Sequence, residues 1–150
     1  MSANAFSFHR ITRRLTSWRM RRLARAFDAL TYFFFAAAVP SSAQIGEGTR
    51  CGHRGTGIVI GHNVKIGKNC LIRQQVVIGG KGRGIEGQPT LGDNVEIGAG
   101  AKVLGPIRLG DNSVVGANAV VVKDVPDGAI VGGIPARIIG WAQDYEQTGG

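Results

Sequence analysis

Aliphatic side chains recur every six residues through most of the chain. They form one run that ends at residue 78 and a second that starts at residue 91 (Ile60, Ile66, Ile72, Ile78; Leu91, Ile97, Val103, Leu109, Val115, Val121). A series of small or apolar residues follows four positions later (Val64, Cys70, Val76, Val95, Ala101, Ile107, Ser113, Ala119, Val125). A period of six matches neither an α-helix nor a single strand. It is typical of a parallel β-helix, in which each six-residue unit forms one side of a triangular coil.

Glycine and asparagine mark the corners of the predicted coils. Glycine makes up 24 of the 150 residues, and it turns the chain where a side chain would clash. Asn63, Asn94 and Asn112 each follow a polar residue at the same place in their repeats, and Asn favours turns. Three six-residue units make one coil, so residues 39–135, less one insertion, predict about five coils.

One interval breaks this repeat. Ile78 and Leu91 are 13 positions apart instead of six, so a loop at about residues 80–89 leaves the solenoid. Loops that project from a rigid repeat often carry substrate contacts. We therefore expect this loop to lie near a functional site.

Residues 1–37 carry most of the basic charge and form a predicted helical arm. The net charge of the chain is +8, and this segment holds seven arginines against one acid, Asp28. Apolar residues at helical spacing predict two short amphipathic helices, or one helix with a phase shift near residues 16–17 (Phe8, Ile11, Leu15, Trp18; Leu23, Phe27, Leu30, Phe34). The apolar run at residues 29–39 is 11 residues long, too short to span a bilayer.

The arm has three interpretations. It packs on the end of the main domain with a solvated basic face, or it lies on an anionic membrane surface. The third is a cleaved signal peptide, with the alanines at 36–38 as its cleavage site. The rest of the chain has no basic stripe interleaved with aromatic residues, which argues against nucleic-acid binding.

Few side chains offer chemistry. Cys51 and Cys70 lack the spacing of a metal site, so we expect no metal, and a reduced cytoplasmic protein is the default. Of the three histidines, His9 lies in the arm and His62 at a predicted corner. His53 stands in the glycine-rich segment CGHRGTGIVIG. Histidine is the side chain naturally suited to acid–base chemistry at neutral pH, which makes His53 the catalytic candidate.

Several segments resemble the hexapeptide-repeat acyltransferases. They are IGHNVKIGKNC, IGAGAKVLGPIRLGDNSVVGANAVVVKDVP and VGGIPARII. HRGTGIVIG, QQVVIGG and IGAGAKVLG are most similar to the serine acetyltransferases. The resemblance covers residues 38–140, between the arm at 1–37 and a tail at 141–150. It implies an all-β fold, a left-handed parallel β-helix that departs from the usual right-handed crossover. It also implies a homotrimer with active sites between subunits, and acetyl-CoA as donor.

The same resemblance implies roles for individual residues. His53 corresponds to the general base, which takes the proton of the acceptor hydroxyl. Small residues correspond to positions that line the pantetheine arm of CoA (Ala99, Gly100, Ala117). Basic residues correspond to positions near its phosphates (Lys123, Arg137), where charge-assisted hydrogen bonds are expected.

The acceptor side departs from the serine acetyltransferase pattern. The family carries an Asp directly before the catalytic His, where this chain has Gly52, and a second Asp that maps to about Ala38. A second His and the Arg before it map to Gln88 and Gly87, and a Thr maps to Val77. A free amino acid needs such charged partners, so their absence bears on the identity of the acceptor.

The sequence predicts an acetyl-CoA-dependent O-acetyltransferase that makes O-acetylserine for cysteine biosynthesis. A sugar hydroxyl, in exopolysaccharide or capsule synthesis, is an equal alternative as acceptor. A non-catalytic trimeric β-helix scaffold is the alternative from another class. A carbonic-anhydrase-like relative would need a cluster of zinc-binding histidines, which the sequence does not indicate. We expect a cytoplasmic protein, and peripheral contact with the inner membrane stays an alternative.

Overall fold

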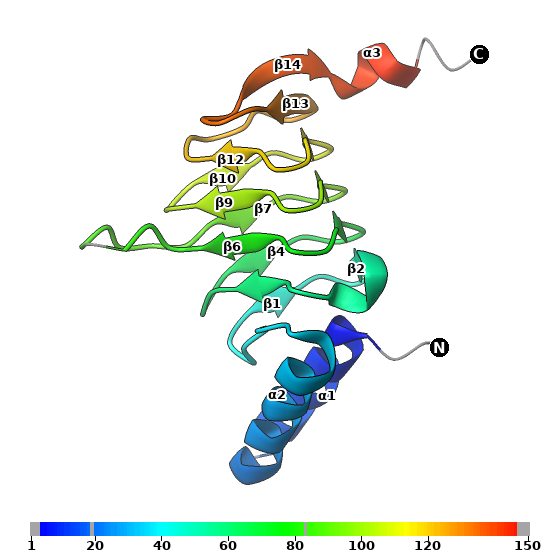
Figure 1. Cartoon of the computed structure of the whole chain (residues 1–150), viewed down its shortest axis with the longest axis vertical. Helices are drawn as coiled ribbons and strands as arrows, with labels where there is room; N and C mark the ends of the chain where they lie inside the picture. The colour runs from blue at the N-terminus through cyan, green and yellow to red at the C-terminus, as the bar shows by residue number, and fades with distance from the viewer. Residues whose placement is uncertain (1–3, 19, 83, 147–150) are drawn as a thin grey trace.

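A helical hairpin lies at one end of a stack of β-coils (Figure 1). The computed structural model describes residues 4–18, 20–82 and 84–146. The hairpin corresponds to the basic arm, and the coils rise from it to the C-terminal strand and helix (Figure 1).

Two helices form the hairpin. Helix α1 (Ala5–Ser17) begins after Asn4, whose side chain accepts a 2.9 Å hydrogen bond from the Ser7 amide and so caps the helix. Helix α2 (Arg21–Phe35) ends where the chain turns into the left-handed conformation at the next residue. The predicted helical arm is therefore confirmed as a pair of helices.

Aromatic packing joins the two helices of the hairpin, and buried residues of α1 join the hairpin to the coils. The ring of Phe8 lies 5.9 Å from that of Phe27 and 5.6 Å from that of Phe35, measured between centroids. Such ring pairs stabilise a contact beyond the area they bury. Ala5 and Phe6 are 0% and 2% exposed and belong to the same hydrophobic core as the coils. The arm therefore closes the first end of the core.

Short parallel strands form the three faces of the stack, which we name after their first strands. The β1 face consists of β1 (Gln44–Ile45), β4 (Lys65–Ile66), β7 (Thr90–Leu91) and β10 (Arg108–Leu109). The β2 face contains β2 (Arg50–Cys51), β5 (Leu71–Ile72), β8 (Glu96–Ile97), β11 (Val114–Val115) and β13 (Ala129–Gly132). The β3 face consists of β3 (Val59–Ile60), β6 (Val77–Gly79), β9 (Lys102–Leu104) and β12 (Val120–Val121).

Equivalent residues of successive coils pair with one another. On the β3 face, Ile60 pairs with Ile78, Ile78 with Val103, and the next pair is Val103 with Val121. These four side chains are 0–2% exposed, and the second predicted series is 0–8% exposed. The two inward positions of each six-residue unit are thus confirmed. Full burial of one such side chain contributes about 1.5–3 kcal/mol.

Polar residues at the corners adopt the left-handed conformation that a tight turn needs. Their φ angles lie between 55° and 62° (Asn63, Asn69, Gln75, Asn94, Asn112, Asn118). Asn tolerates this conformation better than other non-glycine residues. The corner role predicted for Asn63, Asn94 and Asn112 is confirmed.

The stack holds four complete coils, fewer than the roughly five that the sequence predicted. A last coil begins at Val125, which bridges Leu109, and continues through β13. Strand β14 (Arg137–Trp141) then turns back and pairs with β13 in antiparallel fashion, before helix α3 (Ala142–Glu146). An antiparallel strand occupies the edge that another parallel coil would use, so the repeat ends there.

Candidate active site

His53 lies in a second insertion that the sequence analysis did not single out. Cys51 and Ile60 occupy equivalent positions on β2 and β3, yet they are nine residues apart instead of six. The extra length forms a short 3-10 turn, η1 (Gly52–Gly55). The nine-residue interval can be counted in the sequence. It is hard to recognise there, because the small residues and Thr around His53 fit any position of the six-residue repeat.

The backbone of this turn is strained at His53. His53 and Arg54 are consecutive non-glycine residues with φ angles of 46° and 60°. Each such residue costs about 1–3 kcal/mol and persists where the surroundings enforce it. Strain of this kind concentrates at functional sites, which agrees with a special role for the turn.

Neighbouring groups hold the turn in place. The Thr56 hydroxyl donates a 2.9 Å hydrogen bond to the His53 carbonyl oxygen, and the Thr56 amide donates a 3.3 Å bond to the same oxygen. The Gly57 amide donates to the Phe35 carbonyl at the end of α2, at 2.9 Å. At Gly55, where φ is 85°, an added Cβ would lie 2.6 Å from the Cβ of Ala5 in α1. Both helices of the arm therefore shape the turn that carries His53.

The His53 side chain is exposed. Within residues 4–18, 20–82 and 84–146, no group hydrogen-bonds to its ring, and Gly52 puts no carboxylate beside it. The ion pair that the described residues form, between Arg73 and Glu96 at 2.7 Å, does not involve His53. His53 is thus accessible to a substrate, and no described side chain of its own chain orients its ring.

Three of the predicted donor residues lie on the same edge of the stack as His53 (Ala99, Gly100, Ala117). Backbone hydrogen bonds link the turns along this edge (Gln75 amide to Thr56 carbonyl, 2.9 Å; Gly100 amide to Gln74 carbonyl, 3.0 Å; Asn118 amide to Ala99 carbonyl, 2.8 Å). From the arm upwards, these turns are the His53 turn, the turn before β6, the turn of Ala99 and Gly100, and the turn of Ala117. We call this stack of four turns the column.

Close packing between successive turns requires glycine at two positions of this column. An added Cβ on Gly98 would lie 2.5 Å from the Ala117 amide nitrogen, and one on Gly100 would overlap the side chain of Asn118. The Gly100 amide and carbonyl are already bonded within the chain, the carbonyl by Lys102 Nζ at 2.5 Å. Gly100 therefore contributes small size alone, whereas Ala99 is half-buried and Ala117 is exposed.

Lys123 and Arg137, far apart in the sequence, line one pocket of about 220 Å³ beside the end of β12. Both side chains are exposed. The third charged residue of the lining is Asp124, whose carboxylate accepts a 2.8 Å hydrogen bond from the Arg108 amide. Two cations thus meet at one concave surface, which suits a phosphorylated group.

The loop of residues 80–89 projects from the stack between β6 and β7 (Figure 1). Its last part packs back on the corners. Gln88 lies against Gly61 and Gly80, and its Oε1 is buried with no hydrogen-bond partner among the described residues. The turn before β6 stacks on the His53 turn, and the loop begins after β6. The loop therefore leaves the β3 face at the end opposite to the His53 turn.

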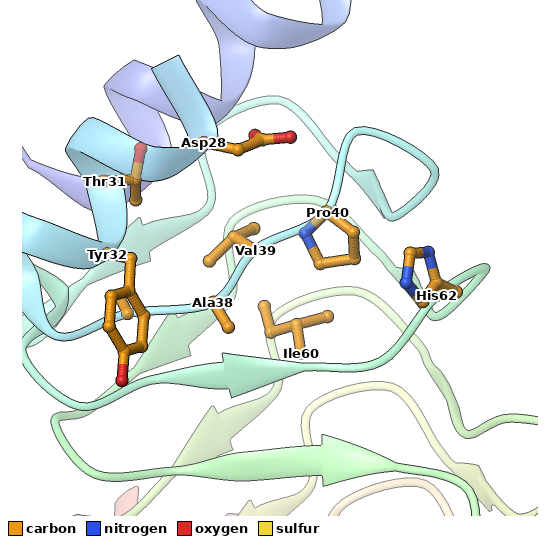
Figure 2. Close-up of a pocket in the computed structure, with 9 residues that line it drawn as sticks. Asp28, Thr31, Tyr32, Ala38, Val39, Pro40, Ile60 and His62 are labelled. Carbon is orange, nitrogen blue, oxygen red and sulfur yellow. The ribbon is translucent and has the colours of Figure 1, made fainter. Parts of the chain in front are cut away.

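A further pocket, of about 240 Å³, lies where α2 meets the first coil (Figure 2). We call it the α2 pocket. Its lining includes Asp28, Thr31 and Tyr32 of α2, residues 37–40, Ile60 and His62. In the sequence, Asp28 contributes only to the charge balance and His62 marks a corner. Nothing in the sequence links the two residues, because they are 34 positions apart and no motif joins them.

The described residues contain no group of three or more His, Cys, Asp or Glu side chains that could hold a metal ion. Among the same residues, no helix combines the length and the apolar character that crossing a bilayer requires.

Comparison with known proteins points to one enzyme class. Residues 88–123 match the family described as "Bacterial transferase hexapeptide (six repeats)". A serine acetyltransferase of Mycobacterium tuberculosis is 44% identical over 136 residues, which cover 90% of this chain and 59% of the relative. One of Synechococcus elongatus is 40% identical over 132 residues, 87% of this chain and 54% of the relative.

A solved structure gives the same result. The serine acetyltransferase of Brucella abortus in complex with coenzyme A superposes with a TM-score of 0.85 and 34% identity, over 91% of this chain and 55% of that one. The fold is therefore a left-handed parallel β-helix, and the recognised resemblance is confirmed. This chain spans between half and two thirds of the length of these relatives.

Proposed function

We propose that this hexapeptide-repeat protein is an acetyl-CoA-dependent O-acetyltransferase that acetylates serine to O-acetylserine, for cysteine biosynthesis. The observation that carries this proposal is the column on one edge of the stack. His53 stands at its lower end, and the turns of Ala99 and Ala117 lie above it. The cationic pocket of Lys123 and Arg137 lies on the last complete coil, beyond β12 and thus across the β3 face from this column.

Each of these residues has a role in the proposed reaction. The phosphates of CoA bind Lys123 and Arg137 through charge-assisted hydrogen bonds. The pantetheine arm crosses the β3 face from this pocket and then follows the column past Ala117 and Ala99, so that its thioester reaches His53. The His53 ring takes the proton of the acceptor hydroxyl as the oxygen attacks the thioester carbonyl, and the protonated ring then supplies a proton to the departing thiolate. A base so placed accelerates the transfer by about 10²–10⁴-fold.

The decisive experiment follows CoA release from acetyl-CoA, with L-serine and with a panel of sugars, for the wild type and for His53→Ala. Serine-dependent release that disappears in the variant supports the proposal. Calorimetric binding of CoA to His53→Ala is the control, because the donor site lies above the substituted residue and should bind as in the wild type. Full activity of His53→Ala with serine contradicts the role of His53.

The acceptor has a second candidate, a sugar hydroxyl in exopolysaccharide or capsule synthesis. The observation in its favour is that Gly52, Ala38 and Gln88 stand where the serine acetyltransferase pattern has charged side chains. Release of CoA with a sugar but not with serine would select this candidate. A solved serine acetyltransferase complex with cysteine, with a TM-score of 0.83 and 36% identity, favours the amino acid instead.

The active unit in this proposal is a homotrimer with active sites between subunits. Its support is the exposed His53 ring, which finds no orienting group among the described residues of its own chain. Light scattering measures the assembly. A monomer with full activity would contradict the shared site, and the absence of CoA binding would favour a trimeric scaffold without catalysis.

We expect a cytoplasmic protein, and we propose that the arm contacts an anionic membrane. Aromatic side chains on the arm are exposed by 63–81% (Trp18, Tyr32, Phe33, Phe34), and arginines accompany them. Exposed aromatic residues on an arginine-rich segment favour the surface of an anionic bilayer. Flotation with vesicles that contain phosphatidylserine tests this contact, with the double substitution Phe33→Ser and Phe34→Ser as comparison. Equal flotation of both proteins, or none, contradicts it.

A further inference from the structure

The α2 pocket combines an apolar floor with polar walls. Asp28 and His62 border it from α2 and from the corner after β3, Pro40 lies between them, and Ala38, Val39 and Ile60 belong to the floor (Figure 2). Its volume of about 240 Å³ is below the roughly 300–1,000 Å³ of pockets for drug-sized ligands. The pocket therefore suits a small metabolite.

The polar groups of this pocket mainly accept hydrogen bonds. The Thr31 hydroxyl donates to the Phe27 carbonyl at 2.8 Å, so only its lone pairs are free. The Asp28 carboxylate has no proton to offer when ionised. His62 Nδ1 forms a 3.1 Å hydrogen bond with the Ser42 hydroxyl, which leaves Nε2 for a ligand. A ligand that supplies donors therefore fits the acceptors of Asp28 and Thr31.

Asp28 is the only acid of the arm, and none of the described residues forms an ion pair with it. Burial raises the pKa of Asp28, while a hydrogen bond from Thr12 and the charge of His62 act in the opposite direction. Burial outweighs these two effects, so a further positive charge in the pocket would stabilise this half-buried carboxylate. The obvious compensating group is a cation.

We infer that the α2 pocket binds the ammonium group of a small hydroxylated amine, with Asp28 as its partner and His62 and Thr31 facing its hydroxyl. Two sources share this chemistry, an amino acid such as serine and an amino sugar. On the proposed function, this amine is the acetyl acceptor. Asp28 and His62 are then positioning residues that select the acceptor, and the arm is part of the substrate site.

The position of the pocket adds a condition. His53 precedes β3 and His62 follows it, so the two histidines lie at opposite edges of the β3 face. The β3 face therefore separates His62 from the His53 of the same chain. On the proposed assembly, the His53 of a second copy of the chain meets a substrate held at His62.

Direct binding tests the inference without relying on acetyl transfer. Isothermal calorimetry on the full chain compares L-serine and D-glucosamine with D-glycerate and D-glucose, which lack the amine. We expect at least one amine to bind, and its partner without nitrogen to bind more weakly. Asp28→Asn should weaken amine binding by about 10-fold to 100-fold, the effect of losing one charge-assisted hydrogen bond. The amine that binds identifies the source.

Two further variants make the result specific. Ala38→Leu should also reduce amine binding because it fills the floor of the pocket, and Glu47→Gln, an exposed acid away from the pocket, should leave binding unchanged. Circular dichroism verifies that each variant is folded. The inference is overturned if neither amine binds, if Asp28→Asn binds as tightly as the wild type, or if glucose or glycerate binds equally well. Amine binding without any CoA release would instead refute only the proposed acetyl transfer.

Discussion

Thr56 holds the His53 carbonyl oxygen through two hydrogen bonds, one from its hydroxyl at 2.9 Å and one from its amide at 3.3 Å. The hydroxyl bond is the one that a side-chain substitution removes. Because the His53 backbone is in a disfavoured conformation, this bond helps to define where the ring stands.

We therefore expect Thr56→Val to lower kcat by roughly 2-fold to 10-fold, the effect of one lost hydrogen bond on a positioned group. The KM for acetyl-CoA should stay unchanged, because the donor turns lie higher on the column. Thr56→Ser keeps the hydroxyl and should retain wild-type activity. Steady-state kinetics of the three proteins decide the matter, and equal kcat values for Val and Ser would contradict it.

Gly55 tests how closely the arm and the His53 turn are joined. Gly55→Ala should destabilise the protein by about 2–5 kcal/mol, because alanine is strained at positive φ and also meets a neighbour. The neighbours are the Cβ of Ala5 at 2.6 Å and the sulfur of Cys51 at 3.3 Å. Urea unfolding measures the change.

Gly128 is the matched control for this substitution. Its φ of 68° is also positive, but an added Cβ would meet nothing within 4 Å. Gly128→Ala should therefore cost only the conformational strain, about 1–2 kcal/mol. If both variants lose the same stability, the contact between Gly55 and α1 has no energetic weight.

The cationic pocket predicts how the donor is recognised. Lys123→Ala and Arg137→Ala should each raise the KM for acetyl-CoA by about 10-fold, since each removes one charge-assisted hydrogen bond. Acetyl-pantetheine lacks the nucleotide phosphates, so the same variants should use it as well as the wild type does. Lys65→Ala, an exposed lysine on β4, serves as control. Equal losses with both donors would exclude phosphate binding.

His9 predicts a loss of stability in mild acid. It is 1% exposed, and burial together with the charges of Arg13 and Arg10 lowers its pKa from 6.5 to about 4. Between these values the unfolded chain binds a proton at His9 that the folded chain does not. The stabilisation is therefore present above pH 6.5 and is lost as pH falls towards 4, by about 3 kcal/mol.

His9→Leu removes this titration. Urea unfolding of the wild type and the variant at pH 7.5 and pH 4.5 isolates the effect from that of the carboxylates, which both proteins share. The free energy of unfolding should fall less steeply with acid in His9→Leu. Parallel decreases in the two proteins would show that His9 is not the group responsible.

The two cysteines should react slowly with thiol reagents. Cys70 is 0% exposed and Cys51 is half-buried, and burial raises the pKa of both thiols. The reactive thiolate is therefore scarcer at pH 8 than in the unfolded chain, and alkylation by iodoacetamide should be at least about 10-fold slower than in urea. Mass spectrometry follows each site. Rapid labelling of folded Cys51 would contradict this expectation and would also disturb a dye assay for CoA.

The repeat was predictable because each coil uses the same two inward positions. Burial of Ile60 and Val64 follows directly from their place in the six-residue period, and so do the corners of Asn94 and Asn112. The coil count was too high because nothing in the periodicity of Val125 or Val131 reveals that β14 turns back. The antiparallel return of β14 depends on packing outside the repeat. The six-residue pattern carries no information about that packing.

The candidate site was predictable only in part. His53 and the residues of the donor column lie in motifs, and the structure brings them to one edge. Asp28 and His62 belong to different elements whose contact depends on how α2 docks on the first coil. Their proximity is a tertiary relationship, and neither residue has a local signal that indicates it.

The antiparallel return of β14 also limits how copies of the protein can associate. A parallel β-helix has an open edge at each end, and such edges can add strands from other molecules. Here the helical hairpin covers the first coil, and β14 occupies the edge of β13. The β2 face therefore ends under the hairpin on one side and in an antiparallel strand on the other, which opposes the end-to-end addition of parallel strands to this face.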